Sequence, residues 1–206
     1  MRTKIALMLL LALPGMGVLL ANPDKKPKKA VTYAISPAQS TLIWNAKKVG
    51  GEHTGTVNLT KGSLLIDGNK LVGGDFTADM TTIKDTDITN EGMNAKLTGH
   101  LKSEDFFSAE KHPASTFRIT KVTPKGGDQY DVTGDLTIKG ITKPVSFPAT
   151  VNVSGTNATA TAKVTVDRLG YDIKYRAAII GTAADKIIDD QFTFDVKLVA
   201  QRPVNN

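Results

Sequence analysis

Near the middle of the chain, positions 130–138 read YDVTGDLTI, with an apolar or small residue at every second position and Asp or Thr between them. A period of two is typical of a β-strand with one dry and one wet face, because successive side chains point to opposite sides. The stretches ATATAKVTV at 158–166 and FTFDVKL at 192–198 repeat the alternation. These segments predict a sheet with one buried face.

Shorter alternations and tight turns extend this pattern over most of the chain. The alternations lie at 42–46, 57–59, 76–80, 117–119 and 145–153, which brings the expected number of strands to about eight. Turn residues at 67–69 and 124–128 separate neighbouring runs by only a few positions, as in consecutive hairpins. About eight strands is the number at which an antiparallel sheet closes around a filled or small-ligand interior. We therefore predict an all-β, antiparallel, up-and-down eight-stranded barrel.

One segment interrupts the alternation, between Thr81 and Pro113. Within it, Leu97 and Leu101 stand four residues apart, which places both on one face of a helix. We expect one short helix inserted around residues 94–102, although Gly99 weakens it.

The N-terminus has the layout of a targeting signal. Arg2 and Lys4 precede an apolar run at 5–13, a Pro-Gly break and a second short apolar run. This predicts a signal peptide over 1–21, cleaved so that the protein is periplasmic or secreted, with an uncleaved anchor as the alternative. Residues 22–30, with four lysines and two prolines, predict a basic flexible tether that can touch anionic lipid headgroups transiently.

Charge and cysteine usage exclude several classes of protein. The formal net charge is +6, but the part of the chain after Lys29 carries 20 Lys and Arg against 19 Asp and Glu. That nearly neutral part lacks the counterion-release driving force for nucleic-acid binding. The chain has no cysteine, which excludes disulfides, thiolate metal sites and a cysteine nucleophile.

The residues offer little support for an enzyme. The three histidines, His53, His100 and His112, form no local metal-ligand pattern, and no Gly-x-Ser-x-Gly motif exists. The nearby carboxylates Asp85 and Asp87, and the pair at 189–190, would need a cleft with shifted pKa values to act as acid or base. We expect no catalytic residues, no metal and no cofactor.

Several segments follow one another in a characteristic order and spacing: YAIS at 33–36, STLIW at 40–44, GSL at 62–64, LKSEDFF at 101–107, HPASTF at 112–117, VTGDLTIKGITKPV at 132–145, DR at 167–168 and IDD at 188–190. In these segments, from about Tyr33 to Ala200, the chain resembles the YceI-like family of periplasmic polyisoprenoid-binding proteins. The resemblance implies that residues 31–201 form a lipocalin-like barrel. It also implies that the interior holds a long-chain isoprenoid lipid, of the quinone or polyprenyl type.

The alternation indicates which side chains would line such an interior. With the apolar positions turned inward, the lining is expected to comprise Leu42, Trp44, Val57, Leu59, Phe76, Ala78, Met80, Phe117, Ile119, Tyr130, Val132, Leu136, Ile138, Phe147, Ala160, Ala162, Val164, Phe192, Phe194 and Val196. Ala160 and Ala162 would leave space where larger residues would fill it. For each position, ordinary core packing is the alternative, since small barrels fill with their own side chains.

Two further groups of residues are candidates for the ends of the interior. Phe106 and Phe107 are adjacent aromatics after the expected helix, so at least one should cap the barrel, as a plug or as a gate over the ligand. Arg168 and Tyr171, followed by two more cations at 174 and 176, are candidate headgroup contacts at the mouth, with a solvated loop as the alternative.

Two rival classes of protein remain. An outer-membrane barrel would have to turn Asp131, Lys163 and similar side chains toward lipid, or else carry aromatic girdles that the sequence lacks. The second rival is a stress or interaction barrel with a solid core and no ligand. In that rival, Ala162→Leu would overpack the core. The sequence leaves the oligomeric state open.

Overall fold

The computed structural model describes residues 30–203, and nearly all of this segment is β-strand and turn. The predicted signal peptide and all of the predicted tether except Ala30 lie outside the described residues. Within them, no helix is both long and apolar enough to span a bilayer.

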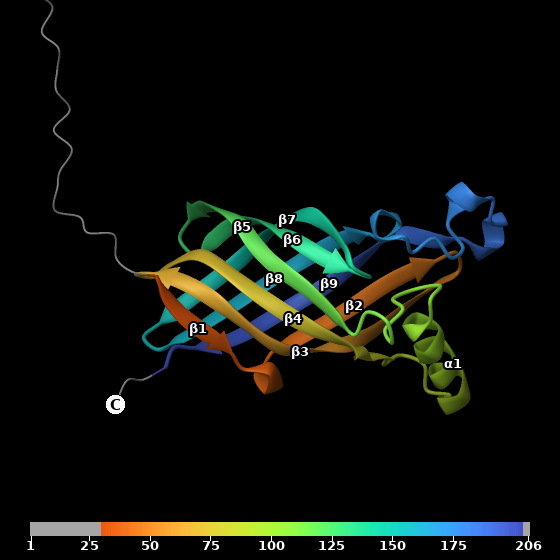
Figure 1. Ribbon diagram of the computed structural model, residues 1–206, viewed down its shortest axis with the longest axis horizontal. Coiled ribbons are helices and arrows are strands. Elements are labelled where there is room, and N and C mark those ends of the chain that lie inside the picture. The colour runs from red at the N-terminus through yellow and green to blue at the C-terminus, as the bar shows by residue number, and fades with distance from the viewer. Residues whose placement is uncertain (1–29, 204–206) are drawn as a thin grey trace, which may run out of the picture.

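Nine strands occupy eight positions around a closed barrel (Figure 1). They are β1 (Val31–Ile35), β2 (Thr41–Lys48), β3 (Gly51–Asp67), β4 (Lys70–Asp85), β5 (Ala114–Gly126), β6 (Gln129–Ile138), β7 (Ile141–Ser154), β8 (Asn157–Asp167) and β9 (Ile188–Gln201). From β2 to β9 each strand pairs antiparallel with the next, and β9 pairs back with β2. The predicted up-and-down eight-stranded barrel is therefore confirmed.

The additional strand β1 shares one barrel position with β2. Both strands lie between β3 and β9 and run antiparallel to them. A 3₁₀ turn at Pro37–Gln39 separates β1 from β2. Pro37 fixes its own backbone angle and lacks an N–H, which favours a break in the strand at this point.

The wall between β7 and β8 is paired over only part of its length. Both strands lie in the described range, and Ile141–Pro148 of β7 has no partner on β8, where pairing begins at Ala149 opposite Ala162. A two-residue loop joins Ser154 to Asn157, so alternate residues of β7 counted back from Ser154 turn their N–H toward β8. Pro148 falls on that side and has no N–H to donate. The ladder stops where a proline would have to continue it.

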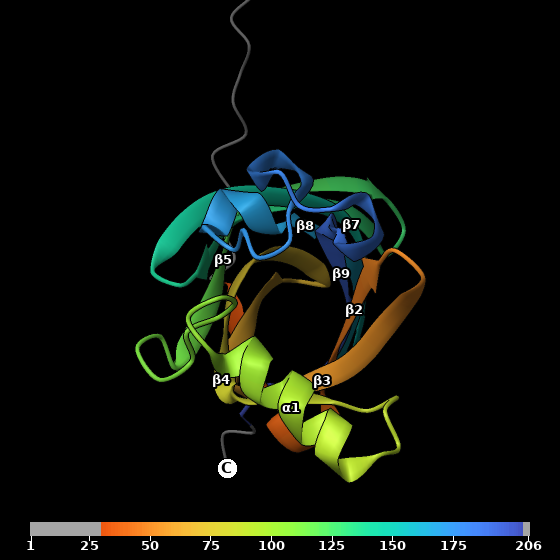
Figure 2. The ribbon, with the colours of Figure 1, turned by 90° about the vertical axis from the view of Figure 1, so that its right-hand side faces the viewer.

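The one α-helix, α1 (Glu91–Lys102), begins three residues earlier than predicted. Asn90 caps it, since the Asn90 side chain accepts a hydrogen bond from the Met93 N–H at 3.0 Å. Leu101 is buried and Leu97 is half-buried, as the four-residue spacing indicated. Viewed along the barrel, α1 crosses one side of the opening and the β8–β9 connection covers the other (Figure 2).

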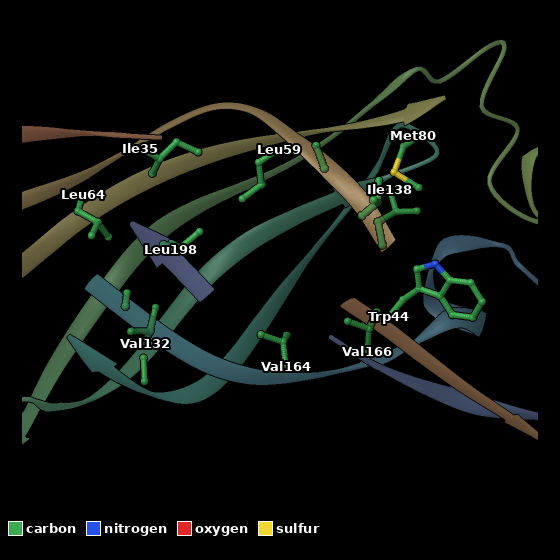
Figure 3. Packing of buried hydrophobic residues seen from close by; sticks show 14 of the residues in the cluster. Ile35, Trp44, Leu59, Leu64, Met80, Val132, Ile138, Val164, Val166 and Leu198 are labelled. Carbon is green, nitrogen blue, oxygen red and sulfur yellow. The ribbon is translucent and has the colours of Figure 1, made fainter. Parts of the chain in front are cut away.

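The hydrophobic core lies inside the barrel. Leu64, Ile66, Val132 and Val166 are at most 2% exposed. Labelled side chains of β3, β4, β6 and β9 point into the space that the strands enclose (Figure 3). The Trp44 indole N–H donates to the Lys84 carbonyl at 3.2 Å.

Candidate ligand-binding cavity

An apolar cavity runs inside the barrel and is bounded by all eight strand positions. Its volume is about 140 Å³, against the roughly 10–15 Å³ that one water molecule needs. The predicted residues that line it are Leu42, Val57, Leu59, Phe76, Ala78, Met80, Phe107, Phe117, Ile119, Val132, Leu136, Ile138, Phe147, Ala160, Ala162, Val164, Phe194 and Val196. Protein interiors ordinarily leave few voids larger than a water molecule. This interior is therefore not filled by its own side chains.

Small residues form one wall of the cavity. Ala149 on β7, Ala162 on β8 and Val196 on β9 stand opposite one another across the three strands, and all three line the cavity. Ala160 extends this wall along β8. This wall is consistent with the expectation that small inward residues leave space inside the barrel.

The aromatic rings lie close against glycines of the neighbouring strands. A Cβ added at Gly134 on β6 would lie 2.4 Å from Cζ of Phe117, and one at Gly62 on β3 would lie 2.6 Å from Cδ1 of Phe76. Each ring therefore occupies the place of a missing side chain on the barrel wall. The glycines let two phenylalanines line the cavity without crossing it.

A second cavity, of about 50 Å³, adjoins the first at the end of the barrel near α1. It is lined by the predicted residues Trp44, Phe106, Arg168 and Phe192, together with Val57, Met80, Phe107 and Phe194, which also line the main cavity. The Phe107 and Phe192 rings meet edge to face, with centroids 6.2 Å apart. Phe107 therefore stands where the two cavities meet, a position suited to a plug or a gate.

The structure disagrees with the expectation that Arg168 contacts a headgroup. Arg168 is only 3% exposed. Its guanidinium donates to the backbone carbonyls of four residues, Ile173, Tyr175, Ile188 and Asp189, at 2.6–3.0 Å. Burial lowers the pKa of Arg168, while the nearby Asp190 carboxylate acts in the opposite direction. The side chain turns inward and fixes the β8–β9 connection, so its donors are already used.

Tyr171 also differs from the expected headgroup contact. It is 2% exposed and lies outside both cavity linings of the described structure. Within residues 30–203 its hydroxyl has no hydrogen-bond partner. Burial, followed by the charge of Asp167, raises the pKa of Tyr171 to about 12. Of the other two mouth cations, Lys174 pairs with Asp172 at 2.7 Å, and the guanidinium of Arg176 lies over the Tyr175 ring.

Several lining residues were not predicted. They are Leu64, Leu71, Ser115, Thr116, Val145, Ala149, Val151, Thr161 and Leu198. Val145, Ala149 and Val151 share the parity of Phe147, so the period of two was sufficient to find them. Tyr130, which was predicted, is buried instead of lining a described cavity, and its hydroxyl accepts the Leu71 N–H at 3.4 Å.

A closed antiparallel meander around an apolar cavity defines a lipocalin-like binding barrel. Residues 33–200 match the YceI-like domain family over most of the chain. The chain belongs to the YceI-like domain family. This is a family of binding proteins, known in general to bind polyisoprenoids, and it is not a known enzyme family.

Two solved structures share this fold. BcnA of Burkholderia cenocepacia has a crystal structure similar to this one, with a TM-score of 0.67 and 24% identity over 81% of this chain and 99% of that chain. A YceI protein of Campylobacter jejuni gives a TM-score of 0.55 and 18% identity over 77% and 87% of the two chains. At these identities the likeness shows the fold alone.

Curated relatives match a shorter stretch. A UPF0312 protein of Vibrio parahaemolyticus is 42% identical over 83 residues, which is 37% of this chain and 44% of that protein. Protein YceI of Escherichia coli O157:H7 is 44% identical over 72 residues, 35% of this chain and 37% of that protein. The chain thus aligns with less than half the length of these relatives.

Proposed function

We propose that this protein is an exported carrier that holds the isoprenoid chain of a quinone or polyprenyl-type lipid inside its barrel. The observation that carries the proposal is the continuous apolar cavity, which every barrel position helps to line. Hydroxyl groups enter that lining only through Ser115, Thr116 and Thr161. Such a lining suits a hydrocarbon chain better than a polar metabolite.

The energetics of burial favour a long chain. At about 0.8 kcal/mol per buried methylene, one five-carbon isoprene unit contributes roughly 3 to 4 kcal/mol. Several units together exceed the roughly 4 to 15 kcal/mol lost in translational and rotational freedom. The lipid then needs few polar contacts, and the protein tolerates different headgroups. The contacts of Arg168 agree with a tolerance of different headgroups, because its guanidinium donates hydrogen bonds to backbone carbonyls of the protein instead of facing a ligand.

The direct test is mass spectrometry of an organic-solvent extract. The protein is purified without detergent from its own host, and its intact native mass is recorded beside the extract. We expect one isoprenoid lipid per protein. A clean apo mass, with no stabilisation on adding a long-chain ubiquinone or a polyprenyl alcohol, would refute the carrier function and favour the solid-core interaction barrel.

Export and membrane contact form a separate part of the proposal, based on residues 1–30 of the sequence. Osmotic shock should release the protein without detergent, and its N-terminal sequence should begin near Asn22. Vesicles containing anionic lipid should retain the released protein weakly, and added salt should abolish that retention, because a basic tether is screened within a Debye length. Retention in the cytoplasmic fraction would refute export.

A further inference from the structure

Outside the cavity linings, three side chains converge at the α1 end of the barrel. His53 lies on β3, Asp85 ends β4, and Asp87 follows two residues later. One potential ligand atom from each of the three lies within 4.8 Å of the others. His53 Nδ1 is 3.0 Å from Oδ2 of Asp87 and 3.9 Å from Oδ2 of Asp85. Residues 32 and 34 positions apart in the chain thus meet across the β3–β4 pair.

Each carboxylate is held through one oxygen, which leaves the other for the cluster. Asp85 Oδ1 accepts the Ile88 N–H at 2.8 Å and the Asn94 side-chain amide at 3.1 Å. Asp87 Oδ1 accepts the Thr54 N–H at 2.7 Å. Hydrogen bonds of this kind orient the ligands in metal sites, because they fix the carboxylate before the ion arrives.

The second oxygen of Asp85, Oδ2, is buried and unpaired in the described part of the chain. The Asp85 side chain is 0% exposed. Within residues 30–203 its Oδ2 is buried without a hydrogen-bond partner. The His53 nitrogen at 3.9 Å is too distant for a hydrogen bond. Leaving a carboxylate oxygen buried and unpaired is costly, and a bound ion is one of the ordinary explanations for it.

We propose that His53, Asp85 and Asp87 bind a divalent first-row transition metal ion, with Zn²⁺ as the first candidate. With bond lengths near 2.0–2.1 Å, two ligand atoms of a tetrahedral zinc ion lie roughly 3.3 Å apart. The distances from His53 Nδ1 to the two aspartate oxygens, 3.0 and 3.9 Å, lie on either side of that value. An imidazole nitrogen in the donor set favours Zn²⁺ over Mg²⁺ or Ca²⁺, which take oxygen ligands.

The site is open enough for an ion to enter. The side chains of His53 and Asp87 are 29% and 35% exposed. Three protein ligands leave one position of a tetrahedral ion for water. Asn94 on α1 bonds Asp85, so a bound ion would connect β3, β4 and α1 at the end of the barrel.

The chain supplies a matched control. His100 Nε2 lies 3.0 Å from Oδ2 of Asp105, the same separation as in the His53–Asp87 pair. The described residues place no second carboxylate beside this pair in a three-ligand cluster. Asp105 is 57% exposed, so Asp105→Asn removes one His–carboxylate pair without disturbing a buried group.

The experiment is isothermal titration of ZnCl₂ into the protein without a polyhistidine tag, after removal of bound metal with a chelator. We expect one saturable site. Asp85→Asn and His53→Gln should each weaken binding at least tenfold. Asn94→Ala should weaken it by roughly 10- to 100-fold, as loss of an outer hydrogen bond to a ligand does. Asp105→Asn should bind as the wild type does.

Circular dichroism reports whether each variant is folded, and Asp85→Asn keeps a side-chain oxygen that can accept the Ile88 N–H. If one variant fails to fold, the other carries the test. The absence of a saturable site in the wild type would overturn the proposal. So would equal binding by wild type and both ligand variants, or an equal loss in Asp105→Asn. Zinc binding does not require lipid in the barrel, so its outcome is independent of the carrier function.

Discussion

Ala162→Leu separates an open cavity from a filled core. Ala162 lies midway along β8 and lines the cavity, between Ala149 on β7 and Val196 on β9. The substitution adds three carbons on the cavity side of the wall. In a close-packed core such an addition destabilises by typically 1–3 kcal/mol, because neighbouring side chains have to move. Here the added carbons enter empty space, so we expect the free energy of unfolding to change by less than about 1 kcal/mol.

The loss should fall on the ligand instead. Three leucine carbons displace about three carbons of the lipid, and at about 0.8 kcal/mol each this removes about 2.4 kcal/mol of burial. The Kd should therefore rise about fiftyfold.

Binding can be followed by quenching of tryptophan fluorescence with a long-chain ubiquinone, because Trp44 is the single tryptophan and lines the adjoining cavity. Urea unfolding gives the stability of the same samples. Thr165→Leu, on the exposed face of β8, places a leucine outside the barrel and should leave the Kd unchanged. The reasoning is refuted if Ala162→Leu lowers stability by 1–3 kcal/mol while the Kd stays at the wild-type value.

Three other substitutions test separate features of the barrel. Gly134→Ala places a Cβ 2.4 Å from the Phe117 ring and 2.5 Å from the Arg118 carbonyl, so it should destabilise by about 1–3 kcal/mol; an unchanged urea midpoint would contradict this. Arg168→Met leaves buried carbonyls unpaired and should cost about 3–5 kcal/mol by urea unfolding, whereas loss below about 1 kcal/mol would mean that these bonds are dispensable. The pKa of Tyr171 is raised to about 12, so the folded protein favours the neutral phenol. This preference contributes on the order of 2 kcal/mol to the free energy of unfolding below pH 10, and the contribution is lost as the pH rises toward 12. Tyr171→Phe should remove that alkaline decline without loss at neutral pH, and an identical decline in the variant would exclude Tyr171 as its source.

The barrel could be predicted from the sequence because each strand keeps one face dry over several residues. The alternation therefore appears directly in segments such as 130–138 and 192–198. The predicted strands do not include β1, whose five residues are too few to show a sustained alternation. The spacing of Leu97 and Leu101 predicts a helix but does not locate its first residue, which the Asn90 cap places at Glu91.

The ends of the site were harder to predict than its wall. The sequence shows that Arg168 carries a charge, but it does not show where the side chain points. That direction depends on the path of the β8–β9 connection, because the guanidinium donates hydrogen bonds to its backbone carbonyls. The cluster of His53 with Asp85 and Asp87 depends on the register that places Gly55 opposite Asp85. Bulges along that ladder shift the pairing, so spacing in the chain could not reveal the meeting.

Pro148 has a consequence for how the barrel can move. Along Ile141–Pro148 no ladder pairing joins β7 to β8, so a separation of the two strands there breaks no ladder hydrogen bond. The unpaired edge of β7 would ordinarily attract a strand from another molecule, but Pro144 and Pro148 withhold the donors that such a strand needs. Along Ile141–Pro148 the barrel wall therefore lacks the ladder that joins β7 to β8 further on, so we expect the two strands to separate there at less cost than between Ala149 and Ser154.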